Sequence, residues 1–348
     1  MKTSFISTQS LWNAPRTGAA RLQAELAKAN EEVVTGTHAD LGLALGSRTA
    51  VSVALRRQRT DLDAITQDNA LTSLRLDATQ ASLQTMREGA DKTLKELLAA
   101  TVEQRGTLVA AAAGERLVAL ASTLNGSSGG QYLFAGLNAQ EAPLTAYAGS
   151  PPSPARTAVE TAFRTAFGVD PGSAGASAIT PAQMAAFLDG AFANLFAETA
   201  WTGTWSDASS RTIQSRIAPD ETAETSATAN AAPFRTLAMA YVMAAGLGLA
   251  SLSTETQAVV TDRIAARLRE AGAGLAGIEA GLGTSQARIK DAESRMAAQK
   301  TLLAARLGEL EGVDPAEAKT RIDRLTTQIQ MSYSLTAQLR QLNLVSYL

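Results

Sequence analysis

The stretch LREAGAGLAGIEAGLGTSQARI, residues 268–289, carries a large apolar side chain at every seventh position. These side chains are Leu268, Leu275, Leu282 and Ile289. A strict seven-residue repeat keeps one seam of an α-helix facing a partner helix, as in coiled-coil packing. The stretch therefore predicts a long helix that packs lengthwise against another helix.

The same stretch contains GAGLAG at 272–277, which matches the glycine pattern of dinucleotide-binding loops. Such a loop follows a β-strand, because its glycines form a tight turn against a pyrophosphate. Here the preceding RIAARLRE has helical periodicity, and Leu275 inside the pattern belongs to the seam. We interpret the glycines as small residues that let helices approach closely, not as a nucleotide site.

The seven-residue repeat continues beyond Ile289 and recurs in the first half of the chain. It continues through Met296, Leu303 and Leu310, and its earlier occurrence comprises Leu55, Leu62, Asn69, Leu76, Leu83, Ala90 and Leu97. We predict two rods, from about Ser47 to about Leu124 and from Thr254 to Glu311. Asn69 either sets the register of the packed seam, as buried seam polar residues do, or lies at a water-exposed part of the helix.

The ends of the second rod carry capping signals. Thr254 and Gln257 fit a capping box ahead of an apolar run. Gly312 predicts the end of this rod. Asp314 as N-cap and Pro315 as first helical residue predict a new helix immediately afterwards.

The middle of the chain has a different composition. Twelve of the sixteen aromatic residues lie between Tyr132 and Tyr241, and turn-rich stretches occur at 125–130, 149–154 and 171–175. Large aromatic side chains can build a compact core. Within this region QMAAFLDGAFANLFAETA has helical periodicity, and WTGTWSD alternates as a short strand or hairpin does.

These patterns predict a mainly α fold. We expect an elongated antiparallel helical bundle or coiled coil, formed by the N- and C-terminal segments, with a small central α+β or irregular insertion. The predicted parts are an N-terminal assembly arm (1–45), a first rod (46–136), an outward-facing insertion (137–235), a second rod (236–312) and a C-terminal assembly helix (313–348).

Composition excludes several classes of function. The net charge of −2 provides no basic footprint for nucleic acid or for an anionic membrane. The chain has no cysteine, and no apolar stretch is long enough to span a membrane. The N-terminus has no apolar core of a signal peptide, so any export is expected to occur without a cleaved leader.

The residues of an enzyme are missing as well. His38 is the one histidine, and no second histidine or cysteine could complete a zinc site. Acid pairs such as Glu31–Glu32 and Asp61/Asp63 lie in charged helical stretches, which favours solvated faces over acid–base chemistry. We predict no catalytic residue, no cofactor and no metal.

Both ends of the chain carry apolar side chains at helical spacing. The N-terminal stripe comprises Leu22, Leu26, Ala29 and Val33, and the C-terminal set comprises Leu335, Leu339, Leu342, Leu344, Val345, Tyr347 and Leu348. A terminal helix that is apolar on more than one side has too little partner surface within one chain. We predict that these residues form an assembly interface; packing of the last helix on its own domain is the alternative.

Three stretches together resemble the family of flagellar hook–filament junction proteins, which are hook-associated and flagellin-like. They are EEVVTGTHADLGLALG near the N-terminus, GGQYLFAG at 129–136, and a C-terminus closing in LRQLNLVSYL. The three stretches bracket the chain and occur in the order typical of the family. It implies a structural protein of the bacterial flagellum whose two ends pack together as a coiled coil.

The resemblance also implies partners and a location. Members form a homo-oligomeric ring between a neighbouring hook-associated protein and flagellin, with no nucleic acid or membrane partner. They reach the extracellular flagellum by type III export without a cleaved signal peptide, and a chaperone holds the C-terminal region. The alternatives are flagellin itself, the filament subunit, or a helical coiled-coil scaffold or signalling protein.

Overall fold

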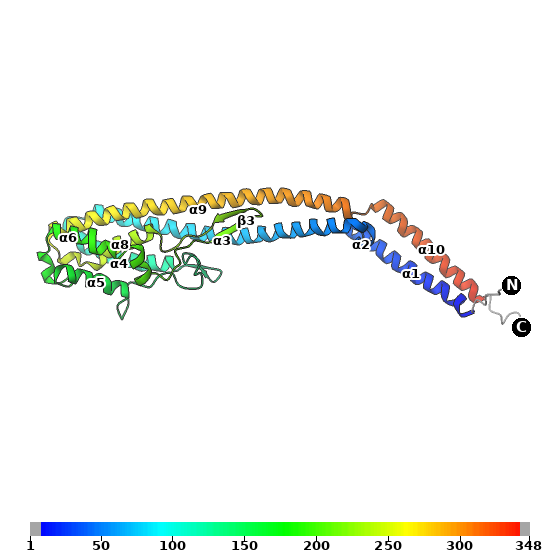
Figure 1. Ribbon diagram of the computed structural model, residues 1–348, viewed down its shortest axis with the longest axis horizontal. Helices are drawn as coiled ribbons and strands as arrows, with labels where there is room; N and C mark the ends of the chain where they lie inside the picture. Colours follow the sequence, from blue (N-terminus) through cyan, green and yellow to red (C-terminus); the bar gives the residue numbers. More distant parts are fainter. Residues whose placement is uncertain (1–7, 342–348) are drawn as a thin grey trace. The chain divides into compact units, whose positions relative to one another are not determined.

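The computed structural model describes residues 8–341 and, within them, the side chains of residues 16–101 and 109–338. The fold is mainly α, as expected from the sequence, and it has two small two-stranded sheets (Figure 1). In chain order the elements are α1 (Thr8–Thr35), α2 (Leu41–Leu45), η1 (Gly46–Arg48), α3 (Thr49–Ala99), α4 (Val102–Leu124), β1 (Ser127–Ser128), β2 (Gln131–Tyr132), α5 (Pro154–Phe167), η2 (Ala174–Ala178), α6 (Pro181–Phe187), η3 (Leu188–Phe192), α7 (Glu198–Thr204), β3 (Gln214–Ala218), β4 (Glu221–Glu224), α8 (Ala232–Gly246), η4 (Leu249–Ser251), α9 (Thr254–Glu311) and α10 (Pro315–Gln341).

Contacts divide the chain into two units. Unit 1 comprises residues 1–63 and 296–348, and unit 2 comprises residues 64–295. Helices α3 and α9 each contribute a segment to both units. The division into five parts that the sequence suggests differs from this division into two units and stays a prediction.

Unit 1 contains two pairs of helices. Helices α1 and α10 pack side by side, with Ala29, Ala318, Leu325 and Ile329 buried. The first part of α3 and the last part of α9 form the second pair, in which Leu62, Met296 and Leu303 are buried. An ion pair between Lys300 Nζ and Asp63 Oδ1, 3.1 Å long, crosses this second pair.

Unit 2 has an extensive core between helices. The seam residues of α3 and α9 in this unit are all buried, namely Leu76, Leu83, Ala90, Leu97, Leu268, Leu275, Leu282 and Ile289. Helix α8, which is apolar nearly all round, packs against α4 and is buried over the nine consecutive residues 236–244. Such a helix needs partners on every side, and unit 2 supplies them.

The first predicted rod is not continuous. Helix α3 ends at Ala99, and Thr101 adopts an extended conformation before α4 begins at Val102. Arg116 of α4 donates to the Gly89 carbonyl and to the Thr93 hydroxyl, and it pairs with Glu96 at 2.8 Å. Helix α4 therefore folds back along α3, because its buried face belongs to the core of unit 2.

A connected set of aromatic rings forms the rest of this core. Neighbouring rings lie 4.8–6.4 Å apart along Phe163, Phe167, Phe187, Phe192, Phe196, Trp201, Trp205 and Tyr147. The prediction of a strand at WTGTWSD was wrong, because Trp201 lies in α7 and Trp205 caps it. The two indoles are four residues apart on one helical face, and their rings stack 5.0 Å apart at 12°.

Asn69 has a role that neither sequence interpretation included. Its side chain is 1% exposed, and its Nδ2 donates to the Ile217 carbonyl at 3.0 Å. Ile217 lies in β3, which pairs antiparallel with β4. Asn69 therefore fixes this hairpin to α3 and is not at a water-exposed part of the helix.

The helix ends follow the predicted signals with one shift. Ser253 caps α9 in place of Thr254, since Ser253 Oγ accepts from the Thr256 amide at 3.3 Å. The end of α9 before Gly312 and the start of α10 at Pro315 are confirmed. Asp314 Oδ1 accepts from the Ala316 amide at 2.8 Å, as an N-cap does.

Candidate assembly surface

The N-terminal apolar stripe lies along the contact between α1 and α10. Leu22 and Leu26 are half-buried there, and Ala29 is fully buried. Val33, in contrast, is 43% exposed, because Glu32 takes the inward position at this turn of the helix. The structure therefore brings three of the four stripe residues to one interface and leaves Val33 at its edge.

The C-terminal set is described only in part. Leu335 is 57% exposed on α10. Leu339 lies in the same helix, but its side chain is outside what the structure describes, and Leu342, Leu344, Val345, Tyr347 and Leu348 lie outside the described residues. Their participation in an interface stays a prediction.

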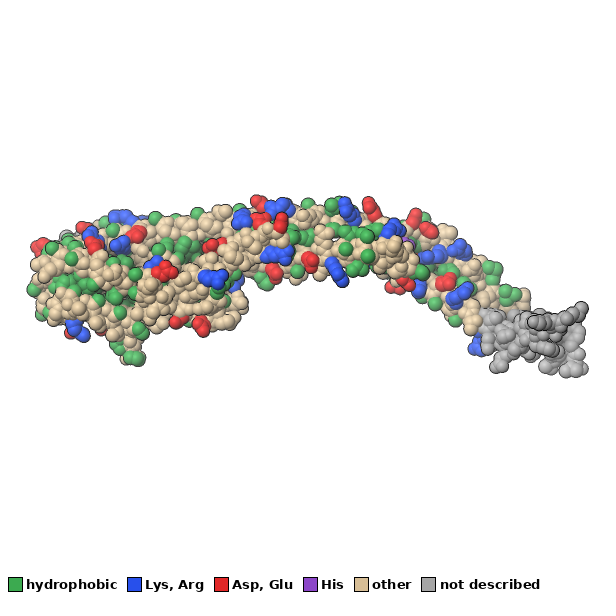
Figure 2. All heavy atoms as spheres, in the orientation of Figure 1, with side chains coloured by type: hydrophobic (Ala, Val, Ile, Leu, Met, Phe, Trp, Pro, Cys, Tyr) green, Lys and Arg blue, Asp and Glu red, His purple; other side chains and the backbone are tan. Residues whose placement is uncertain are grey.

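Several large apolar side chains of the α1–α10 pair face solvent. Val34 is 86% exposed, and Met331, Tyr333 and Leu335 are each more than half exposed. Acidic and basic side chains are interspersed over the face seen in Figure 2, so no field of one sign dominates there. Contiguous apolar surface marks sites that another protein covers, and these side chains are the ones that the described part of the α1–α10 pair could offer to such a site.

The rod seam is buried along most of its length. Besides the buried residues named above, Leu55 and Leu310 are half-buried, each near the end of the α3–α9 pair in unit 1. No third layer of helices covers this pair among the described residues of unit 1. Apolar side chains on the flanks of the pair are therefore exposed, by 43% to 56% in Val51, Val53 and Leu302.

The glycines of GAGLAG lie inside α9, as expected. A Cβ on Gly274 would lie 2.5 Å from Cγ of Pro233 in α8, so this glycine permits the close approach of two helices. Gly272 and Gly277 have no such neighbour, since a Cβ on either would meet no atom within 4 Å. The stretch contributes to packing in unit 2 and contains no phosphate-binding turn.

Two buried carboxylates lie on helices of unit 1, close to the segments that connect its helix pairs. Glu311 ends α9 and is 4% exposed, and Glu32 on α1 is 7% exposed. The interpretation of Glu31–Glu32 as a solvated face was wrong for Glu32. One signal could have identified Glu311: it is an acid at a helix C-terminus, where the helix dipole disfavours negative charge unless a cation is near.

The one histidine of the chain lies beside a single carboxylate. His38 lies in the connector after α1, with its Nδ1 3.8 Å from Glu32 Oε1. No group of three histidine, aspartate or glutamate side chains in the described part of the chain could hold a metal ion. Within the same residues, no helix combines the length and the apolar character needed to cross a bilayer.

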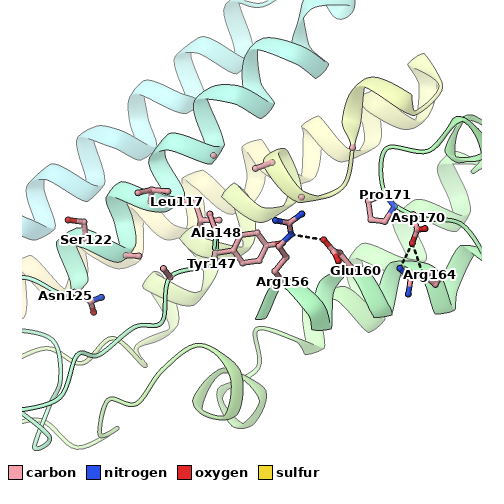
Figure 3. A pocket seen from close by; sticks show the side chains of 17 residues that line it. Leu117, Ser122, Asn125, Tyr147, Ala148, Arg156, Glu160, Arg164, Asp170 and Pro171 are labelled. Carbon is pink, nitrogen blue, oxygen red and sulfur yellow. Dashed lines mark hydrogen bonds and ion pairs between the residues drawn. The ribbon is translucent and has the colours of Figure 1, made fainter. Parts of the chain in front are cut away.

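Unit 2 has a cavity of about 780 Å³ between α4, α5 and the end of α8. Leu117 of α4 lines one wall, and in Figure 3 the ring of Tyr147 points toward the Arg156 guanidinium. Arg156 Nε pairs with Glu160 at 2.8 Å, and Arg164 Nε pairs with Asp170 at 2.7 Å. Because each arginine is neutralised by its own carboxylate, the rim provides no net charge for an ionic ligand.

The phenol of Tyr147 provides a pH test of this part of the fold. Burial raises the pKa of Tyr147 to about 12, while nearby Arg156 lowers it and Glu160 raises it. The folded protein favours the neutral phenol. The contribution of buried Tyr147 to the free energy of unfolding is therefore complete below pH about 10, and it is lost as the pH rises toward 12. The rise of this pKa from 10.0 to about 12 corresponds to a loss of at most about 2–3 kcal/mol in the free energy of unfolding.

We expect unit 2 of the wild type to lose stability between pH 10 and 12, and a Tyr147→Phe variant to lose less. Urea unfolding followed by tryptophan fluorescence at pH 8, 10 and 11.5 measures this difference. Parallel losses in the two proteins would contradict the assignment of this effect to Tyr147.

Two family models match the sequence. The bacterial flagellin N-terminal helical region matches residues 6–139, and the bacterial flagellin C-terminal helical region matches residues 266–348. Together they cover more than half of the chain. A solved structure assigned to a flagellar hook-associated protein of Vibrio parahaemolyticus is similar over 77% of this chain and 96% of its own, with 12% identity and a TM-score of 0.42. No match to a curated protein was found.

Proposed function

Because both ends of this chain belong to the bacterial flagellin family, we propose that it is a structural subunit that joins the flagellar hook to the filament. In this proposal the terminal helices mediate self-assembly into a ring, and the chain has no catalytic role. The ring contacts a neighbouring hook-associated protein on one side and flagellin on the other. An export chaperone holds the C-terminal region before assembly, and the subunit is exported to the extracellular flagellum.

The observation that carries the proposal is the position of the matched regions in the fold. They contain α1, α3 and α4 at one end of the chain and α10 with most of α9 at the other. The paired helices α1 and α10 lie within them and expose Val34, Met331, Tyr333 and Leu335. These exposed apolar side chains suit burial against neighbouring subunits.

The unmatched residues between the two regions contain α5 to α8 and most of the aromatic core. Its aromatic side chains are buried in a core that the segment shares with α4, so no neighbouring subunit is needed to cover them. We propose that it is the part of the subunit that faces outward. The boundaries 137–235 predicted from the sequence include α5 to β4 and only the first residues of α8.

Flagellin is the second candidate, because the two matching models describe helical regions of that protein. The junction assignment is favoured by the stretch TGTHADLGLALG at 35–46, where flagellins typically carry a stretch containing serine and asparagine. In this chain the stretch contains the connector between α1 and α3, with Gly36 and Gly46 at positive φ and Asp40 capping α2.

Deletion of the gene, followed by electron microscopy of the cells, separates these candidates. For a junction protein we expect hooks without filaments and flagellin released into the medium, with recovery when the wild-type gene is restored. Loss of filaments without released flagellin would identify the filament subunit instead. Normal filaments would contradict both assignments and favour a helical scaffold.

A further inference from the structure

Two short connectors meet in unit 1. The first connector, residues 36–40, follows α1, and the second connector, residues 312–314, lies between α9 and α10. The His38 amide donates to the Glu311 carbonyl at 2.9 Å, and the Val313 amide donates to the Gly36 carbonyl at 3.0 Å. Thr37 and Gly312 form the antiparallel bridge between these two bonds. The connectors are therefore tied to each other by backbone pairing, at the place where the helix pair α1–α10 continues into the pair α3–α9.

Glu311 binds the second connector to the start of α3. Its Oε1 accepts from the Ser52 hydroxyl and from Arg56 Nε at 2.8 Å, and its Oε2 accepts from Arg56 Nη2 at 2.5 Å. Such a two-point contact between guanidinium and carboxylate fixes orientation as well as distance. The hydrogen bonds from Arg56 lower the pKa of Glu311 against the opposing effect of burial.

Glu32 binds the first connector to the helices beside it. Its Oε1 accepts from the Ala39 amide at 3.2 Å, and its carboxylate pairs with Arg321 of α10. Glu32 thereby joins α1, the connector after it and α10. His38 Nδ1 lies 3.8 Å from the same carboxylate.

Each of these carboxylates is nearly completely buried, whereas Arg56 and Arg321 keep 40% or more of their side chains exposed. A buried ion pair contributes little net stability, since removal from water offsets the attraction between the charges. What it provides is a single geometry, because a buried carboxylate without its partners is strongly disfavoured.

We propose that Glu311 and Glu32 are positioning residues, which lock the two connectors and so hold the α1–α10 pair in the arrangement that self-assembly requires. The locking does not depend on the flagellar role, whereas its consequence for assembly rests on the proposed function. The pairing of Glu311 with Arg56 gives the clearest test, since it is a two-point contact that joins α9 to α3.

The test compares the full-length wild type with Glu311→Gln, Arg56→Gln and the double variant. Hydrogen exchange followed by mass spectrometry measures the peptides that contain His38 and Val313. We expect exchange about tenfold faster or more in each single variant, which is the loss of about 1.4 kcal/mol of local stability. The double variant should exchange no faster than the single ones, because the pair acts as a unit.

Glu309→Gln is the matched control. Glu309 is exposed on the same last turns of α9, so its replacement removes an equal charge without touching the connectors. This variant should exchange as the wild type does. The urea midpoint of unit 2 should stay unchanged in every variant, because unit 2 contains neither connector.

In a second experiment, sedimentation measures the self-association of the same purified proteins. We expect Glu311→Gln to self-associate at least about tenfold more weakly than Glu309→Gln. Unchanged exchange in Glu311→Gln, or connectors that exchange freely already in the wild type, would overturn the locking. Faster exchange with normal self-association would overturn the positioning role. Neither result depends on whether gene deletion supports the hook–filament assignment.

Discussion

Removal of residues 335–348 will leave a folded, largely helical protein that no longer assembles. The truncation removes seven large apolar side chains, of which Leu335 is described as 57% exposed on α10. If each contributes only about 1 kcal/mol to contacts between subunits, their loss weakens assembly by about five orders of magnitude. Unit 2 should be unaffected, because its buried residues lie between 64 and 295.

Sedimentation and electron microscopy measure the loss of assembly, and far-ultraviolet circular dichroism measures the retained helix. Leu71→Gln is a suitable control, since Leu71 is a 63% exposed leucine on α3 in unit 2. This substitution removes exposed apolar surface away from the terminal helices and should leave assembly intact. Normal assembly of the truncated protein would contradict the role given to the C-terminal end.

Replacement of Gly136 by alanine will destabilise unit 2 strongly. Gly136 has φ +62°, and a Cβ at this position would lie 2.5 Å from the Ser209 carbonyl oxygen and 2.6 Å from that of Arg211. The left-handed backbone costs an alanine about 1–2 kcal/mol, and the displacement of two carbonyls adds about 1–3 kcal/mol. The total expected loss is about 2–5 kcal/mol.

Gly130→Ala provides the matched control for this substitution. Gly130 belongs to the same GGQYLFAG stretch and has φ +77°, but a Cβ there would meet no atom within 4 Å. We expect it to lose only the backbone contribution of about 1–2 kcal/mol. Urea unfolding followed by tryptophan fluorescence compares the two variants, and equal losses would show that the contacts with Ser209 and Arg211 are unimportant.

The long helices could be predicted from the sequence because a seven-residue repeat is a local signal. Leu76, Leu83, Leu275 and Leu282 are buried, and the helix starts near Thr254 and Pro315 carry capping residues within one turn. The break at Ala100–Thr101 had no comparable signal. The glycines of this rod do not mark the break, since Gly89, Gly106 and Gly114 all lie inside helices.

The parts that could not be predicted depend on contacts between distant residues. The pattern W-x-x-x-W fits alternation in a strand as well as one face of a helix, and only the stacking of Trp201 on Trp205 distinguishes them. Glu32 and Glu311 belong to ordinary charged stretches in the sequence. Their burial follows from pairing with Arg321 and Arg56, which lie more than 250 residues away.

The stacked indoles of Trp201 and Trp205 also provide a spectroscopic probe of the unfolding of unit 2. Two indoles whose centres are 5.0 Å apart are close enough for their electronic transitions to couple, so we expect a contribution of the pair to the circular dichroism of the folded state. Unit 1 has Trp12 as its one indole, so it cannot produce such a contribution by itself. The signal of the coupled indoles therefore reports on the unfolding of unit 2 in the unlabelled protein, whereas the helical signal in the far ultraviolet reports on both units.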